Sequence, residues 1–143
     1  MTPIQKNNNS NTTGDSHRFC LMCGRDNPLS FGLQFEHDNN GVFFTEFKSN
    51  DTLQGYEGIM HGGVLSALLD TAMAQCLLQQ NIEAVTGELN VRFFDPVDCN
   101  STLTIRAWVD STLPPLFHLR AQIRVGDTIV CKAKAKFMQR DKK

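Results

Sequence analysis

Four segments in the second half of the chain alternate apolar and polar residues with a period of two. This alternation is typical of β-strands with one buried face and one solvated face. The connections between these segments are too short for the crossovers that parallel strands need. One of them, Gly126-Asp127, has the form of a two-residue hairpin turn. We therefore predict an antiparallel meander of strands at 85–93, 102–109, 117–125 and 129–137. In the first of these strands, the residues that the alternation places on the polar face are Thr86, Glu88, Asn90 and Arg92.

One apolar segment of helical length precedes these strands. Residues 63–80 are rich in Leu, Ala and Met, and apolar side chains cover most of the circumference of the predicted helix. Such a helix is buried, so an antiparallel sheet must curl round it in an α+β arrangement. Strands at 31–36 and 42–47, joined by a turn at 39–41, predict a hairpin before the helix.

Length and charge limit the possible organisation and partners. The 143 residues suit one domain, and we expect a disordered polar tail over 1–17 followed by the domain over 18–143. The 14 Lys and Arg residues against 15 Asp and Glu residues provide no basic field for nucleic acid or an anionic membrane. No apolar run reaches the roughly 20 residues of a membrane span, and no signal peptide is evident, so the expected location is cytoplasmic.

The five cysteines do not suggest a disulfide framework, because their number is odd and three of them lie singly in apolar patterns. Cys20 and Cys23 have the spacing of a zinc knuckle or a redox pair, but a tetrahedral site needs further ligands. His17 and His37 could supply them only if the fold brought them together. The pattern therefore favours a structural loop, and we expect no metal and no cofactor.

Asp70 lies in the middle of the apolar helix, flanked by apolar side chains. An unpaired buried carboxylate costs several kcal/mol or more, so this residue needs a partner or a function. Two interpretations stand at this point: a structural hydrogen bond to a loop or a neighbouring subunit, and a catalytic carboxylate.

The turn His61-Gly62-Gly63 lies where the predicted helix begins. Its backbone N–H groups are among the unsatisfied donors of the first turn, at the positive end of the helix dipole. Such a turn can hold a carbonyl oxygen and stabilise an oxyanion, although a tight turn requiring glycine is the simpler interpretation. Asp70 follows Gly62 by eight residues, roughly 12 Å along a helix, which suits an extended thioester. Nucleotide-binding, metalloprotease and nucleophile-elbow motifs do not occur in the sequence.

Residues 54–64, running on to Leu68-Leu69-Asp70, resemble the signature of the PaaI-like hot-dog thioesterases. The segments 20–24 and 27–28 are similar to the amino-terminal part of many members, and the resemblance covers roughly residues 19–138. It implies a hot-dog fold, in which an antiparallel sheet of about six strands wraps one long central helix. It also implies a homodimer or homotetramer with active sites at the dimer interface.

The resemblance assigns roles to individual residues. Asp70 matches the general base or nucleophile, the Gly62 N–H matches the group that polarises the thioester carbonyl, and His61 matches a histidine that helps to position the substrate. Thr86 matches a hydroxyl residue that orients the attacking water from the partner subunit. The remaining candidates for substrate binding are Gly63, Gln54, Gly55 and Asn27.

The implied function is an acyl-CoA thioesterase that hydrolyses an acyl- or aryl-CoA thioester to the free acid and CoA. The main alternative is a non-catalytic acyl-CoA-binding module of the same fold. A dehydratase and a purely structural oligomerisation domain are further alternatives; the presence of both Asp70 and the glycine turn favours catalysis over these. The alternating row Lys132, Lys134 and Lys136 indicates a solvated strand face, with phosphate binding as the other interpretation.

Overall fold

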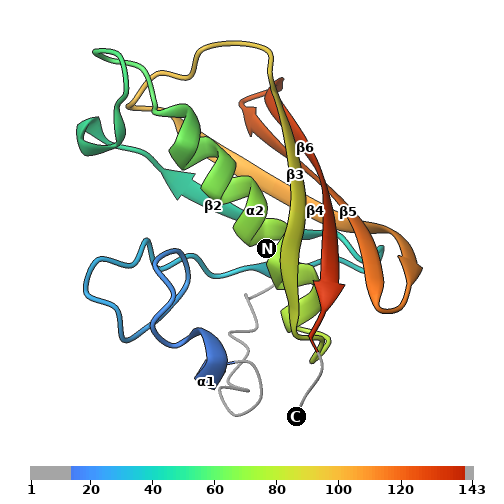
Figure 1. Cartoon of the computed structure of the whole chain (residues 1–143). Coiled ribbons are helices and arrows are strands. Elements are labelled where there is room, and N and C mark those ends of the chain that lie inside the picture. The colour runs from blue at the N-terminus through green and yellow to red at the C-terminus, as the bar shows by residue number, and fades with distance from the viewer. Residues whose placement is uncertain (1–13, 141–143) are drawn as a thin grey trace.

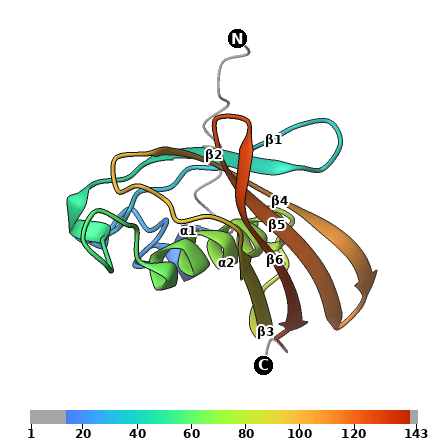
Figure 2. The same cartoon turned by 90° about the horizontal axis from the view of Figure 1, so that it is seen from above.

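A computed structural model describes residues 14–140 of the chain. One antiparallel sheet of six strands curls around the long helix α2 (Gly62–Leu78), which lies on its concave side (Figures 1 and 2). This architecture is the predicted hot-dog fold. In chain order, the strands are β1 (Glu36–His37), β2 (Phe43–Lys48), β3 (Ala84–Phe93), β4 (Thr102–Leu113), β5 (Leu116–Val125) and β6 (Thr128–Gln139). A short helix α1 (Gly14–His17) and a 3-10 turn (Asp51–Leu53) complete the elements.

Helix α2 begins one residue before the predicted start and ends two residues before the predicted end. Nine of its 17 residues are buried, which confirms that the sheet encloses it, because an apolar helix gains stability only by removing that surface from water. The helix packs most extensively against β4 and also against β3, β5 and β6. The buried residues of the helix are Leu65, Leu68, Leu69, Thr71, Ala72, Met73, Cys76, Leu77 and Leu78.

The strand order β1-β2-β4-β5-β6-β3 differs from a simple four-strand meander. Strands β4, β5 and β6 are consecutive neighbours, as predicted, but β3 pairs with β6 instead of β4. The connection 94–101 crosses from one part of the sheet to another, and alternation alone does not encode that choice of neighbour. Consequently β3 is an edge strand, and Val85 and Phe93 on it are about half exposed.

The predicted hairpin over 31–47 is only partly correct. Its second strand and its turn form, and the Asp38 carboxylate accepts hydrogen bonds from the N–H groups of Asn40 and Val42 in that turn. Its first strand shrinks to the two residues of β1. The reason is a competing partner: the N–H groups of Phe31 and Leu33 donate instead to carbonyls of the segment 21–22.

At the end of the predicted disordered tail over 1–17, Gly14–His17 forms α1 and His17 is half-buried. The rest of that predicted tail, residues 1–13, lies outside the described residues. Within residues 14–140, no helix is both long and apolar enough to cross a membrane.

Candidate active site

Asp70 and Thr86 meet where α2 faces β3. The Thr86 hydroxyl donates a hydrogen bond of 2.6 Å to Asp70 Oδ1. Asp70 is half-buried and Thr86 is exposed, so the pair lies at the margin of the core, where a ligand can reach it. The structure therefore supplies the partner that a carboxylate on this apolar helix needs, and leaves it accessible.

A β-bulge brings Thr86 to Asp70. Thr86 pairs with Phe137 and Glu88 pairs with Lys136, so Gly87 is an extra residue on β3. The side chain of Phe137 is buried against the core, and paired residues on adjacent strands point to the same face. Thr86 therefore faces α2, whereas strict alternation assigns it to the polar face with Glu88. A glycine inside a strand is the sequence signal for this bulge.

The contact between Asp70 and Thr86 lies within one chain. The resemblance implies that the hydroxyl residue acts from the partner subunit, but the Thr86 side chain contacts Asp70 of its own chain. The acid and the hydroxyl thus form one preassembled unit within a single chain.

His61 is the N-cap of α2. Its Nδ1 accepts a hydrogen bond of 2.8 Å from the Gly63 N–H, and its backbone is extended, with φ −62° and ψ 129°. An imidazole nitrogen that accepts a hydrogen bond carries no proton, so this contact assigns the proton of neutral His61 to Nε2. His61 therefore orders the first turn of the helix with one nitrogen and keeps the other as a donor.

The first turn of α2 leaves one backbone donor for a ligand. The Gly63 N–H is occupied by His61, and the N–H groups of Val64 and Leu65 donate to the His61 carbonyl. Within the described residues, no acceptor is found for the Gly62 N–H. The candidate oxyanion donor is thus the Gly62 N–H. The Gly63 N–H already donates to His61, so it is not free for the predicted role in binding substrate.

The loop before the helix forms a shallow pocket of about 290 Å³ next to this donor. The Gln54 side chain accepts a hydrogen bond of 2.9 Å from the Gly58 N–H, and Gly55 packs against His61, where a Cβ would lie 3.4 Å from the His61 Cα. These two predicted residues therefore shape the loop. The pocket is lined by Gly55, Tyr56, Ile59, Met60, His61 and Gly62.

Asn27 is not brought to this pocket. Its side chain donates to the Phe19 carbonyl at 3.0 Å and accepts from the Leu29 N–H at 2.9 Å, so both ends of the amide hold the amino-terminal loop. The Phe93 ring, at the end of β3, does lie at the site: it packs against Gly62, where a Cβ would be 3.6 Å from its Cζ atom.

Other nucleophiles of the described chain are poorly placed for catalysis. Burial raises the pKa of the Cys76 and Cys131 thiols to about 12, so both are neutral core groups at physiological pH. The Ser66 hydroxyl donates to the Gly62 carbonyl at 2.9 Å and has no neighbouring base among its contacts. Asp70 remains the reactive group best supported by the geometry.

A larger hollow of about 450 Å³ lies on the outer face of the sheet. Lys132 and Lys134 line it, and each alternates with a buried residue that faces α2, so this hollow is on the side away from Asp70. The row of lysines thus forms a cationic outer face together with Arg92 and Arg120. Phosphate binding there stays a prediction.

Comparisons with known proteins agree with this fold. Residues 57–113 match the model of the thioesterase superfamily. Acyl-coenzyme A thioesterase THEM4 of Bos taurus is 27% identical over 118 residues; the match covers 73% of this chain and 48% of the bovine protein. The chain thus spans about half the length of that relative.

Two solved structures share the fold. The PaaI protein of E. coli, from the phenylacetic acid degradation operon, superposes with a TM-score of 0.70 at 22% identity, covering 76% of this chain and 83% of PaaI. A hypothetical thioesterase of Streptococcus pneumoniae, solved with coenzyme A, has a TM-score of 0.71 at 19% identity, covering 78% of this chain and 88% of that protein. The family match over residues 57–113, together with the shared fold, confirms the predicted resemblance of this chain to the PaaI-like hot-dog thioesterases.

Proposed function

We propose that the protein hydrolyses acyl-CoA or aryl-CoA thioesters, with Asp70 as general base or nucleophile and the Gly62 N–H as oxyanion donor. The observation that carries this proposal is the Asp70–Thr86 pair, an accessible carboxylate held by a hydroxyl at 2.6 Å on an otherwise apolar helix. The bovine relative named as an acyl-CoA thioesterase and the streptococcal protein solved with coenzyme A support the choice of substrate class.

Thioester hydrolysis needs an activated oxygen nucleophile and a group that stabilises negative charge on the carbonyl oxygen. Asp70 supplies the first, either by taking a proton from water or by attacking the carbonyl carbon to form an anhydride. The Gly62 N–H supplies the second at the positive end of the α2 dipole, and the free Nε2 proton of His61 is a further donor for the substrate. Neither step requires a metal or an organic cofactor.

The two groups are too far apart to act on one carbonyl within a single chain. Asp70 follows Gly62 by eight residues of α2, roughly 12 Å along the axis at 1.5 Å per residue. The reacting atom must lie within about 3 Å of both the nucleophile and the oxyanion donor. We therefore propose that one catalytic centre combines Asp70 and Thr86 of one chain with Gly62 of a second copy.

The free edge of β3 is suited to bind a second copy of the chain. It is ten residues long, its outer edge pairs with no strand among residues 14–140, and apolar side chains along it are exposed, a combination that makes an edge prone to pair. Antiparallel pairing of two β3 edges about a two-fold axis runs the two α2 helices in opposite directions. That arrangement moves the start of one α2 toward the middle of the other, where Asp70 lies. We accordingly propose a homodimer, or a tetramer of such dimers.

The test is thiol release from a panel of short, medium, long and aromatic acyl-CoA esters. We expect turnover of at least one ester, and a loss of about a hundredfold or more in kcat for Asp70→Asn, within the range of general-base catalysis. Asp110→Asn is the matched control, because it removes a surface carboxylate that pairs with Arg120 at 3.1 Å. Absence of turnover combined with tight acyl-CoA binding would support the binding-module alternative, and an Asp70→Asn variant as fast as the wild type would refute the mechanism.

A further inference from the structure

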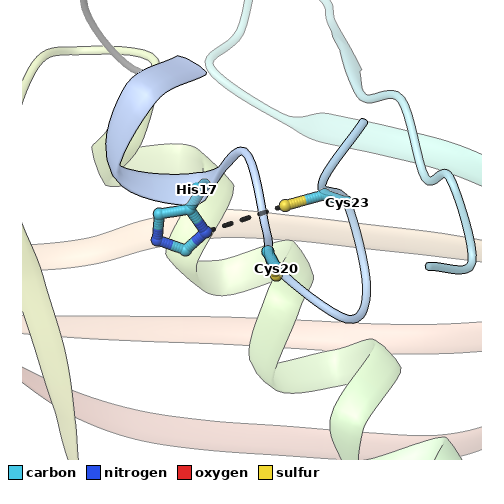
Figure 3. A group of neighbouring side chains, drawn as sticks. All are labelled: His17, Cys20 and Cys23. Atoms are coloured by element: carbon cyan, nitrogen blue, oxygen red, sulfur yellow. Dashed lines mark hydrogen bonds between the residues drawn. The ribbon is translucent and has the colours of Figure 1, made fainter. Parts of the chain in front are cut away.

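Three side chains that can bind a metal ion meet at the amino-terminal end of the described chain. His17 comes from α1, and Cys20 and Cys23 come from the loop that follows it (Figure 3). One potential ligand atom from each residue lies within 4.8 Å of the other two, and all three residues are half-buried. The fold thus brings His17, but not the exposed His37, to the cysteine pair.

The separation of these atoms matches the requirements of a tetrahedral zinc site. Zinc binds sulfur at about 2.3 Å and histidine nitrogen at about 2.0–2.1 Å, so a tetrahedral angle separates the two ligand atoms by about 3.6 Å. Cys23 Sγ lies 3.7 Å from His17 Nδ1. An ion could therefore replace the present contact between these two side chains with almost no movement of the backbone.

The loop is already shaped to hold sulfur ligands. The Met22 N–H donates to Cys20 Sγ at 3.4 Å, and Gln75 Nε2 of α2 donates to Cys23 Sγ at 3.4 Å. Donors of this kind orient metal-bound thiolates and offset their charge. Gly24 closes the loop tightly, since a Cβ there would lie only 2.4 Å from the Cys20 nitrogen.

Burial disfavours the charged forms of His17 and Cys23 when no metal is bound. Burial lowers the pKa of His17, although the charge of Glu83 opposes this, so the imidazole is neutral and has a lone pair for a metal. Burial, followed by the contact with Cys20, raises the pKa of Cys23 to about 12. A metal ion deprotonates a coordinating thiol directly, so the raised pKa of Cys23 does not prevent coordination.

We propose that His17, Cys20 and Cys23 form a binding site for Zn²⁺ or a similar thiophilic divalent cation. Three protein ligands leave the fourth tetrahedral position to water, because no fourth Cys, His, Asp or Glu joins the group among the side chains that the structure describes.

The site is separate from the proposed catalytic centre. Gln75 follows Asp70 by five residues, so their side chains point in directions roughly 140° apart around α2, at 3.6 residues per turn. An ion bound there would connect α1 and the loop 18–33 to the side of α2 away from Asp70. The inference therefore does not depend on the proposed hydrolase activity.

The experiment is Co²⁺ titration of the reduced, chelator-treated full chain, because tetrahedral cobalt reports its ligands by absorption. We expect one equivalent to bind, with visible d–d bands and a thiolate-to-cobalt charge-transfer band in the near ultraviolet, and Zn²⁺ to displace it. Cys20→Ser and Cys23→Ser should each weaken or remove the charge-transfer band, and His17→Ala should weaken binding. His37→Ala is the matched control and should bind as the wild type does, since His37 is exposed and does not belong to the cluster of potential ligands.

The thermal stability of the wild-type chain is a second readout, and it does not depend on how well the variants fold. Excess Zn²⁺ at a hundredfold its Kd should raise the Tm of the wild-type chain by roughly 5–10 °C through linkage. No charge-transfer band and no rise in Tm for the reduced wild type would overturn the proposal. So would undiminished Co²⁺ binding by a folded Cys20→Ser/Cys23→Ser double variant. A Cys20–Cys23 disulfide in the air-oxidised protein, without metal binding after reduction, would also overturn it in favour of a redox pair.

Discussion

Replacement of Gly62 by proline removes one hydrogen-bond donor from the start of α2 and little else. Gly62 is the first helical residue, a position at which proline is well tolerated because its N–H has no partner within the helix. The preceding residue, His61, already has the extended backbone that proline requires before it, with φ −62° and ψ 129°. Space is also available, since a Cβ at this position would lie 3.6 Å from the Phe93 ring, an ordinary contact.

The expected effect is large for catalysis and small for stability. Loss of one oxyanion donor costs about 10²–10³ in kcat, or roughly 3–4 kcal/mol of transition-state stabilisation. Gly62→Ala is the matched control, because it adds a Cβ but keeps the N–H. We expect Gly62→Ala to stay within about tenfold of the wild type, and Gly62→Pro to fall at least about tenfold below Gly62→Ala.

The assay is thiol release from the best acyl-CoA ester at saturating concentration, with urea denaturation as the folding control. An equal kcat for the proline and alanine variants, with both folded, would refute the assignment of the Gly62 N–H as the oxyanion donor. A change confined to KM would also refute it, because it would place the N–H in ground-state binding instead.

Four further predictions concern the positioning of the site and the stability of the fold. Thr86→Val should lower kcat by about tenfold through loss of the hydrogen bond to Asp70, while Thr86→Ser retains most activity; equal rates in thiol-release assays would contradict the positioning role. Leu68→Ala should lower the free energy of unfolding in urea by about 2–5 kcal/mol, because this side chain is fully buried; a loss below about 1 kcal/mol would contradict the packing. His61→Ala should lose about 0.5–2 kcal/mol with the N-cap, and His61→Asn should recover most of it in the same assay; equal losses would exclude the capping role. Gly24→Ala should be clearly destabilising, since the added Cβ meets backbone atoms at 2.4–2.6 Å, whereas Gly87→Ala, whose nearest neighbour is at 3.5 Å, should cost about 1 kcal/mol or less; equal unfolding free energies would contradict this difference.

The fold class could be predicted from the sequence because its dominant signals are local. Period-two alternation located the four long strands, and the apolar content of residues 63–80 located α2 to within two residues. Strand neighbours could not be predicted in the same way. The pairing of β3 with β6 depends on how the connection 94–101 crosses the structure, and nothing within either strand encodes that path.

The sequence allowed the candidate site residues to be named, but their positions relative to one another could be predicted only in part. The start of α2 and the position of Asp70 follow from helix spacing, whereas the approach of Thr86 depends on one extra residue, Gly87, that reverses the phase of the strand. The cysteine cluster shows the same limit. The spacing of Cys20 and Cys23 is visible in the sequence, but only the turn of α1 brings His17 to them.

The central claim is that each catalytic centre combines Asp70 of one chain with Gly62 of another, and complementation between two inactive variants tests it most directly. Differently tagged Asp70→Asn and Gly62→Pro chains are co-expressed, the two tags confirm that mixed dimers form, and thiol release is measured on the whole, unfractionated population of dimers. Random pairing makes half of the dimers mixed, and each mixed dimer has one intact centre, so we expect about one quarter of the wild-type rate from two nearly inactive parents. If mixed dimers form and their rate stays at the level of the parents, both groups act within one chain and the account of a shared centre is wrong.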